Sequence, residues 1–317
     1  MNKAPDKNQP HIIQIRNTPL SISVYSVKDK PLNMHDDGIL EIIFCLSGSV
    51  KFAYAYEEFT LNAGEYVSVD KDAYYLYSSQ PNMCVSFYID LMLFKHKYPN
   101  IQYTLFVCEG CTESTTQYPT KYHDSLRGKL IALLKVILDG DVASKAGQIE
   151  SSVESIVDLF VHHFNIYFFH TGKLEADEAI LNRNEQIAAY MNQHLSEKLT
   201  LNDVAKHIGV SVGYLSEYMR KNSIGFREML FYYRANRSEW YLINTSDTII
   251  EISEKCGFSD PQYYYKAFKK WYRCTPKQFR EKYIKQSKSN MQYHEPSTVR
   301  EIVDHLLVEH YIDLFFK

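Results

Sequence analysis

Two clusters near the end of the chain carry the side chains best suited to contact nucleic acid. The first comprises Val212, Gly213, Ser216, Glu217 and Arg220, and the second comprises Pro261, Gln262, Tyr265, Lys266, Lys269, Lys270 and Arg273. Amide, carboxylate and ammonium groups hydrogen-bond to base edges in the major groove, whereas lysine and arginine neutralise phosphates. We therefore predict contact with double-stranded DNA. Gln262, Lys266 and Glu217 are expected to read bases, and Lys269 and Arg273 to contact phosphates.

A glycine-centred turn precedes each cluster, at Gly209 and Gly257. Ser211, and either Ser259 or Asp260, can cap the helix that follows the turn. Apolar or small residues at helical spacing precede each glycine: Leu201, Val204, Ala205 and Ile208, then Ile249, Ile252, Ser253 and Cys256. The repeat predicts two helix-turn-helix units. Their second helices, 211–222 and 260–271, should share one face of a helical domain and be joined by a helix over 226–244.

The second repeat, IIEISEKCGFSDPQYYYKAFKKWYRCTPKQFR over 249–280, resembles the signature of AraC/XylS-type transcription regulators. Arg234 matches an arginine of that family's linker helix. The resemblance covers about a hundred residues and implies a ligand-responsive regulator, usually an activator, that binds two successive major grooves. It also implies a homodimer and RNA polymerase as a partner. The chain departs from the family pattern at Ser238, Ser253, Trp240 with Tyr241, and Met219 with Arg220.

Charge separates the chain into two unlike parts. Residues 183–288 carry 18 Lys and Arg against 11 Asp and Glu, and the remainder carries 17 against 27. A basic domain is the electrostatic footprint of phosphate binding. Apolar residues make up 45% of the sequence, but no run approaches the roughly 20 residues of a membrane span. With a polar N-terminus and six scattered cysteines, we expect a cytoplasmic protein without membrane contact, disulfide framework or cofactor.

Short apolar runs separated by turn residues predict a β-barrel over residues 1–120. The expected strands are 39–46, 50–56, 66–69, 74–77 and 85–89, with a turn at Ser47-Gly48-Ser49. The pieces EIIFCLSGSV and LNAGEYVSV resemble the cupin-type barrel of the same regulator family. A metal cupin is expected to have a second histidine at Asp37 and a final one at Tyr75. That departure predicts no functional metal, although His35, Asp37 and Glu41 could supply part of a ligand set.

Aromatic residues line the predicted strands. Phe52, Tyr54 and Tyr56 alternate and so share one strand face, and Tyr75 and Tyr77 share another. Tyrosine combines a flat apolar face with a hydroxyl group, which suits a polar organic ring. Together with His35 and Glu41, these residues form the predicted effector site, for which a sugar is the expected ligand. The alternative is ordinary sheet packing.

The sequence thus predicts an α+β protein with five segments. These are a cupin-like effector-sensing barrel (1–120), a helical dimerisation segment (121–170), a linker (171–183), an AraC-type DNA-binding domain (184–285) and a C-terminal extension with one helix (286–317). We expect an activator of carbohydrate-utilisation genes and no enzyme. Two alternatives remain: a cupin-like metalloenzyme fused to a DNA-binding domain, and a partner-controlled DNA-binding protein without an effector.

Overall fold

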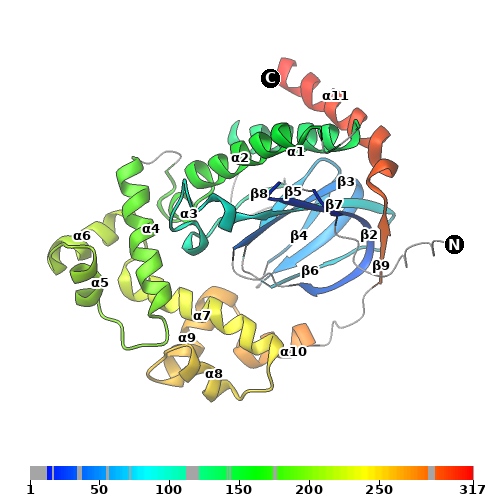
Figure 1. The fold of residues 1–317 in the computed structure, drawn as a ribbon. Helices are drawn as coiled ribbons and strands as arrows, with labels where there is room; N and C mark the ends of the chain where they lie inside the picture. Colours follow the sequence, from blue (N-terminus) through cyan, green and yellow to red (C-terminus); the bar gives the residue numbers. More distant parts are fainter. Residues whose placement is uncertain are drawn as a thin grey trace.

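The computed structural model describes residues 13–15, 18–33, 38–54, 57–70, 73–111, 121–140, 142, 144–173, 177–284 and 290–316. A β-barrel with helices on one side occupies one part of the molecule, and a separate group of helices lies below it (Figure 1). We call residues 13–173 with 290–316 the β-domain, and residues 177–284 the helical domain. The α+β class predicted from the sequence is confirmed.

One antiparallel sheet forms the barrel. Its strands are β1 (Ile13–Gln14), β2 (Leu20–Asn33), β3 (Ile39–Tyr54), β4 (Glu57–Asn62), β5 (Tyr66–Val69), β6 (Tyr74–Tyr77), β7 (Asn82–Asp90), β8 (Glu109–Gly110) and β9 (Asn290–His294). The order is β1-β2-β6-β3-β5-β8, and β7 pairs with both β2 and β3, so the sheet curls back on itself. Short 3-10 turns are η1 (Leu91–Phe94), η2 (Ile101–Tyr103) and η3 (Pro296–Val299).

Strand β3 runs through the segment where the sequence predicted a turn. Ser47 to Ser49 belong to one strand that pairs with β7 and β4. The register shifts between Cys45 and Ser47, and Gly48 takes φ of 69°. An added Cβ at Gly48 would lie 2.0 Å from the Pro81 carbonyl oxygen. Glycine therefore allows a bulge and a close approach of neighbouring backbone, which bends the strand without ending it.

Two long helices, α1 (Lys121–Leu138) and α2 (Ala146–His163), pack across the barrel and are followed by α3 (Ile166–Thr171). Their apolar stripes are buried within the one chain: Leu134 is 1% exposed and Phe160 is 0% exposed. Both belong to the same core as Phe44 and Phe87 of the barrel. The sequence predicted a dimer interface in this segment, 121–170, which would require an apolar surface left for a second copy. Since the barrel and its own helices cover these stripes, the stripes give no support for that interface.

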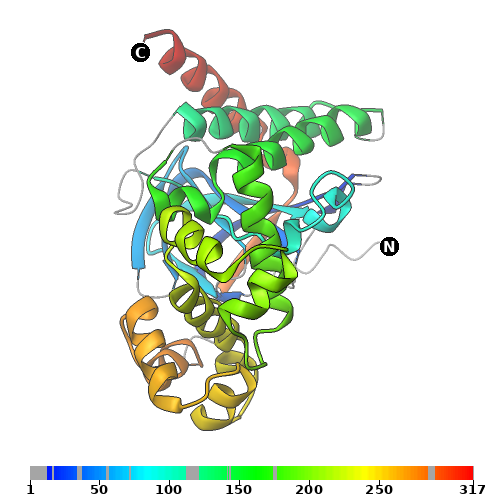
Figure 2. The same ribbon diagram turned by 90° about the vertical axis from the view of Figure 1, so that its left-hand side faces the viewer.

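The C-terminal extension returns to the barrel. Strand β9 pairs with β2, with Tyr25 opposite Tyr293 and Val27 opposite Met291. Helix α11 (Arg300–Phe316) then packs beside α1, and Figure 2 shows it at the opposite end of the molecule from α8 to α10. Val303 of α11 is 1% exposed in the barrel core. The extension is therefore a structural part of the β-domain, and the helical domain is inserted between two segments of it.

The helical domain comprises α4 (Glu178–Gln193), α5 (Leu201–His207), α6 (Val212–Asn222), α7 (Phe226–Asn244), α8 (Ile249–Lys255), α9 (Pro261–Tyr272) and α10 (Pro276–Ile284). The predicted connecting helix over 226–244 is confirmed by α7. Helix α4 begins at Glu178, inside the segment expected to be a linker. Across the part of the chain that the structure describes, no helix is long and apolar enough to cross a membrane.

Candidate nucleic-acid interface

Each helix-turn-helix unit starts with a capping box on its first helix. In α5, the Thr200 hydroxyl accepts from the Asp203 amide at 3.3 Å, and the Asp203 carboxylate accepts from the Thr200 amide at 2.9 Å. In α8, Thr248 and Glu251 make the same pair of bonds at 3.2 and 2.7 Å. These bonds satisfy amide groups that a helix start otherwise leaves without partners. Local sequence therefore sets where both units begin.

The turn between the two helices has the same geometry in both units. Gly209 and Gly257 have φ of 71° and 86°, in the left-handed region that glycine tolerates. The second helices then begin at the predicted caps: the Ser211 hydroxyl accepts from Tyr214, and the Asp260 carboxylate accepts from Gln262. Of the two alternatives left open, Asp260 is therefore the cap of α9. The two units therefore share the same turn geometry and the same kind of capped start for α6 and α9.

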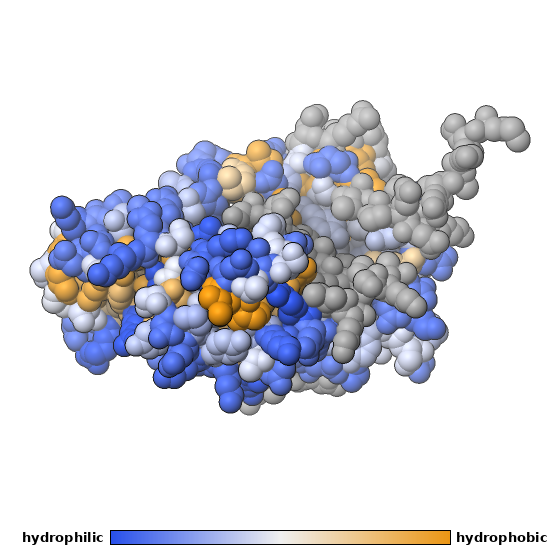
Figure 3. Space-filling view, turned by 90° about the horizontal axis from the view of Figure 1, so that it is seen from below, coloured by the Kyte–Doolittle hydropathy of each residue, from blue (hydrophilic) through white to orange (hydrophobic). Residues whose placement is uncertain are grey.

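Helices α6 and α9 each bury one face and expose the other. In α6, Leu215 and Met219 are buried, whereas all five predicted contact residues, Val212, Gly213, Ser216, Glu217 and Arg220, are exposed. In α9, Tyr264 and Phe268 are buried. The predicted contacts Gln262, Tyr265, Lys266, Lys269, Lys270 and Arg273 are exposed, and Pro261 is half-buried. Seen from below (Figure 3), most of the coloured residues are hydrophilic, with hydrophobic patches among them.

The exposed charges differ in how far they are already paired. Within the described part of the chain, the side chains of Lys266 and Lys269 make no ion pair or hydrogen bond. Glu217 instead accepts from Arg220 at 2.7 Å and lies 3.3 Å from the Lys221 ammonium. These two cations hold the pKa of the Glu217 carboxyl down, at about 2. Glu217 is thus ionised and must exchange partners before it can accept from a base.

The structure shows an arginine–tyrosine contact at the start of each second helix, which the sequence did not single out. The tyrosine belongs to the second helix, and the arginine comes from α4 or α7. The Arg183 guanidinium lies 5.4 Å from the ring centre of Tyr214 and also donates to its hydroxyl. The Arg227 guanidinium lies 5.4 Å from the ring centre of Tyr263. Tyr214 and Tyr263 are both the third residue of their helix and both are exposed. Aligning the repeats on their caps would have paired these tyrosines.

Comparison with known proteins agrees with this geometry. A family model described as a helix-turn-helix domain matches residues 204–282. The chain is 34% identical over 105 residues to the Msm operon regulatory protein of Streptococcus mutans, covering 31% of this chain and 38% of that protein. It is 31% identical over 98 residues to the urease operon transcriptional activator of Escherichia coli, covering 31% of this chain and 33% of that protein. These matches agree with the resemblance of residues 184–285 to AraC/XylS-type helix-turn-helix domains, and in this chain that domain follows an N-terminal β-domain.

The matches span about a third of the length of these curated relatives, at 38% and 33%. Among solved structures, apo ToxT from Vibrio cholerae is 13% identical with a TM-score of 0.42, covering 84% of this chain and 98% of that one.

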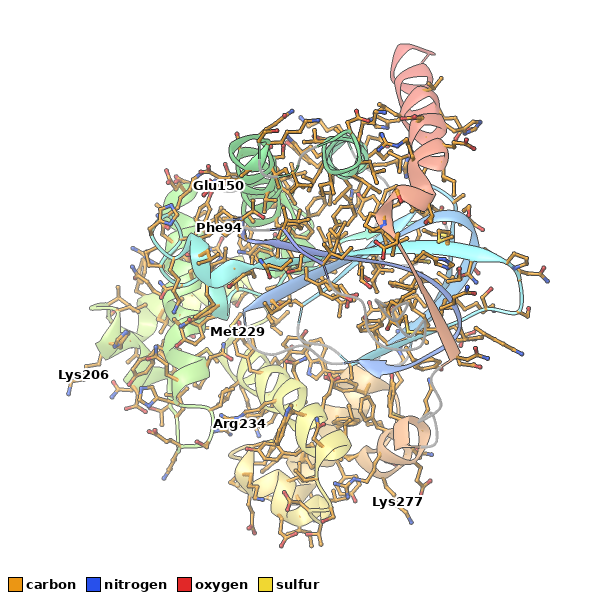
Figure 4. All side chains as sticks on the ribbon, turned by 45° about the vertical axis from the view of Figure 1, so that its right-hand side comes forward. Phe94, Glu150, Lys206, Met229, Arg234 and Lys277 are labelled. Carbon is orange, nitrogen blue, oxygen red and sulfur yellow. The ribbon has the colours of Figure 1, made fainter. Side chains whose placement is uncertain are left out.

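Arg234, matched to the AraC linker helix by sequence, holds the two helix-turn-helix units together. It is 6% exposed, and its guanidinium donates to the carbonyl oxygens of Leu195 at 2.8 Å and Glu197 at 2.7 Å. Gly257 packs at the same place, since an added Cβ would lie 2.1 Å from the Leu195 carbonyl oxygen. The turn of the second unit therefore rests on the α4–α5 connection of the first. Figure 4 shows Arg234 inside the helical domain, with Lys206 and Lys277 at its outer ends.

The barrel interior contains part of the predicted effector site. Phe52 is 1% exposed and stacks on Tyr74, with 5.4 Å between ring centres. Tyr54, the next residue on that face, donates to the buried Glu109 carboxylate at 2.5 Å. Glu41 is fully buried and accepts from the Tyr74 hydroxyl. Tyr74 and Glu109 were not predicted as site residues, whereas His35, Asp37 and Tyr56 lie outside the described residues.

Tyr75 and Tyr77 were predicted to line the effector site, but they face away from Phe52. In the β3–β6 register Phe52 lies opposite Leu76, and Ala53 lies opposite Tyr75. Because side chains alternate across a strand, Tyr75 and Tyr77 project from the outer face of the barrel. Tyr75 packs against Tyr283 of α10, with 5.8 Å between ring centres. These tyrosines belong to the contact between the two domains.

Metal-ligating residues do not gather in the described part of the chain. No group of three or more His, Cys, Asp and Glu side chains with the spacing of a metal site occurs there. Cys108 and Cys111, the isolated C-x-x-C pair, are buried, and burial raises the pKa of the Cys108 thiol.

Proposed function

We propose that this protein binds double-stranded DNA by placing α6 and α9 in successive major grooves, and that it regulates transcription in response to a small molecule. The observation that carries the proposal is the matched pair of helices, each fixed by a capping box and glycine turn and each exposing its polar face. Half-sites one helical turn apart, roughly 34 Å, are expected for such a pair.

We assign base contacts to Gln262, Lys266 and Glu217 and phosphate contacts to Lys269 and Arg273. Lys266 and Lys269 support this division because both are exposed and unpaired within the described chain. A side chain that reads a base contributes about 1–3 kcal/mol to the preferred sequence, whereas one phosphate contact changes the salt slope by about one.

Selection from random duplexes, followed by binding titrations at several salt concentrations, tests this assignment. Lys266→Ala should lower affinity for the selected sequence far more than for unrelated DNA. Lys269→Ala should weaken both alike and reduce the salt slope. Lys173→Ala, an exposed lysine outside the helical domain, is the charge-matched control. Loss of discrimination with Lys269→Ala but not with Lys266→Ala would reverse the assignment, and no DNA binding by the unsubstituted protein would end the proposal.

We place the effector in the barrel interior, around Glu41, Phe52 and Tyr54. Stacked aromatic rings beside two buried carboxylates, Glu41 and Glu109, offer flat apolar faces and hydrogen-bond acceptors. That combination suits a polyhydroxylated ring such as a sugar. A thermal-shift screen of sugars is the test, since a ligand that binds only the native state raises its stability. Tyr54→Phe should weaken the response to any sugar that binds, and a response unchanged by Tyr54→Phe would exclude this site.

Activation is the proposed direction of regulation, with RNA polymerase as the partner. The support is the E. coli relative, which is a transcriptional activator of the urease operon. Transcription in vitro from a promoter carrying the selected site should increase when the protein is added. A decrease would indicate a repressor.

A further inference from the structure

A second pocket lies where the β-domain meets the first helix-turn-helix unit. Its walls come from residues 103–105 and 165–167 of the β-domain and from α4, the end of α6 and α7 of the helical domain. The pocket has an empty volume of about 410 Å³, including its open mouth. Met229, which lines the pocket, is labelled at this junction in Figure 4.

Two polar atoms that line the pocket lack hydrogen-bond partners within the described residues. The Thr104 side chain is 4% exposed, and its hydroxyl has no hydrogen-bond partner among the described residues. The Asn184 amide nitrogen is also buried and has no such partner in the described chain. Glu185 is 7% exposed, and no ion pair or hydrogen bond to its carboxylate is found within the described residues. Buried polar groups are normally satisfied, so the two unpaired atoms of Thr104 and Asn184, beside the Glu185 carboxylate in one pocket, require an explanation.

Glu185 is the charged group of this pocket. Burial raises the pKa of its carboxyl to about 7, although the nearby His162 opposes the shift. A buried carboxylate is costly unless a cation or hydrogen-bond donors compensate its charge. The fold thus retains an acidic group at a domain junction, and His162 compensates its charge only in part.

The chemistry of the lining selects a ligand class. The Glu185 carboxylate favours a cation, the Asn184 amide nitrogen requires an acceptor, and the Thr104 hydroxyl can serve either. Leu105, Ala188 and Met229 supply apolar walls for a few methylene groups. An anion would be repelled by Glu185, and a neutral diol would leave the carboxylate charge uncompensated. We propose that this junction pocket binds a small primary amine that also carries a hydroxyl group, with the ammonium on Glu185 and the hydroxyl on Asn184 and Thr104.

Such a ligand would contact both domains at once. Thr104 belongs to the β-domain, and Asn184 and Glu185 belong to α4 beside the first helix-turn-helix unit. A ligand that favours one arrangement of the junction shifts the protein toward that arrangement. The effect on DNA affinity rests on the function proposed above, whereas binding itself does not.

Isothermal titration at pH 8 with three matched probes tests the site: 3-amino-1-propanol, 1-propylamine without the hydroxyl, and 1,3-propanediol without the amine. The full chain should bind the amino alcohol saturably, with at least tenfold lower affinity for each of the other two. Glu185→Gln, which keeps the shape of the side chain, should abolish binding, and Thr104→Val should reduce the preference for the hydroxyl. Glu150→Gln, an exposed carboxylate on α2 labelled in Figure 4, should leave binding unchanged.

Thermal melting of each variant without ligand identifies any that fail to fold. Absence of binding to the unsubstituted protein overturns the proposal. So does equal binding of all three probes, or binding that survives Glu185→Gln in a folded protein. A DNA titration without any probe tests the proposed function separately, so loss of DNA binding with probe binding intact would refute only the regulatory role.

Discussion

The Glu239 carboxylate accepts a hydrogen bond from the Ala73 backbone amide at 3.0 Å. Glu239 lies in α7, the helix that joins the two helix-turn-helix units, and Ala73 immediately precedes β6 of the barrel. The Glu239 side chain is fully buried and also accepts from the Tyr272 hydroxyl of α9. One carboxylate therefore connects the barrel, α7 and α9.

Replacing Glu239 by Ala should destabilise the protein because three buried donors, the Ala73 amide, the Tyr272 hydroxyl and the Asn236 side-chain amide, lose their bond to this carboxylate. Each unsatisfied donor costs about 1–3 kcal/mol, so we expect a loss of about 3 kcal/mol in the free energy of unfolding. Urea denaturation of the full chain measures it. Glu254→Ala, an exposed carboxylate on α8, should change stability by less than about 0.5 kcal/mol. Equal effects of the two substitutions would contradict a structural role for this contact.

The C-terminal helix offers a test with chemically identical substitutions. Val303 is 1% exposed against the barrel core, and Val308 on the same helix is 59% exposed. Val303→Ala should lower the free energy of unfolding by about 2 kcal/mol, from lost burial and the cavity left behind. Val308→Ala should leave it nearly unchanged. If Val303→Ala proved as mild as Val308→Ala, α11 would not be part of the β-domain core in solution.

Alanine substitutions at the two turn glycines, Gly209 and Gly257, distinguish the cost of backbone strain from the cost of a steric clash. An alanine at Gly209 would meet nothing within 4 Å among the described residues, so its cost is that of the left-handed backbone alone. An alanine at Gly257 would have the same strain and would also collide with the Leu195 carbonyl oxygen at 2.1 Å. We expect a loss of about 1 kcal/mol for Gly209→Ala and about 3 kcal/mol or more for Gly257→Ala. Thermal and urea denaturation measure both, and similar losses would rule out the close packing of the two units.

Glu185 predicts a distinctive dependence of stability on pH. Its pKa is raised from the ordinary 4.5 to about 7 by burial, with His162 opposing. Between these values the folded state binds the proton more tightly than the unfolded state, so the free energy of unfolding falls as pH rises through this window. The loss attributable to Glu185 is about 3 kcal/mol once the pH exceeds the folded pKa.

Glu185→Gln should remove this contribution. The free energy of unfolding of the variant should therefore rise relative to that of the unsubstituted protein between pH 5 and pH 8. Glu150→Gln provides the exposed control. Urea titrations at each pH measure the difference, and a difference that is constant with pH would show that Glu185 is not buried as a proton-binding group.

The arrangement of the helical domain follows from local sequence signals. Capping residues such as Thr248, the turn glycine Gly257 and the apolar spacing of α8 and α9 each act within a few residues. Local signals of this kind agree with one another, so the predicted helices, including α7 with its bounds, are confirmed. The exposed faces of α6 and α9 follow from the same periodicity.

Only the tertiary structure decided three features. These are the side of the sheet on which Tyr75 lies, the continuity of β3, and the surface against which the C-terminal extension packs. Alternation shows that Tyr75 and Tyr77 share a face, but a one-residue choice of register determines whether that face points into the barrel. Likewise, the apolar stripe of α11 requires a partner, but its spacing does not say which surface covers it. The helical domain separates Val303 from the barrel strands in the sequence, yet Val303 packs in the barrel core. Periodicity does not encode a contact between residues so distant in sequence.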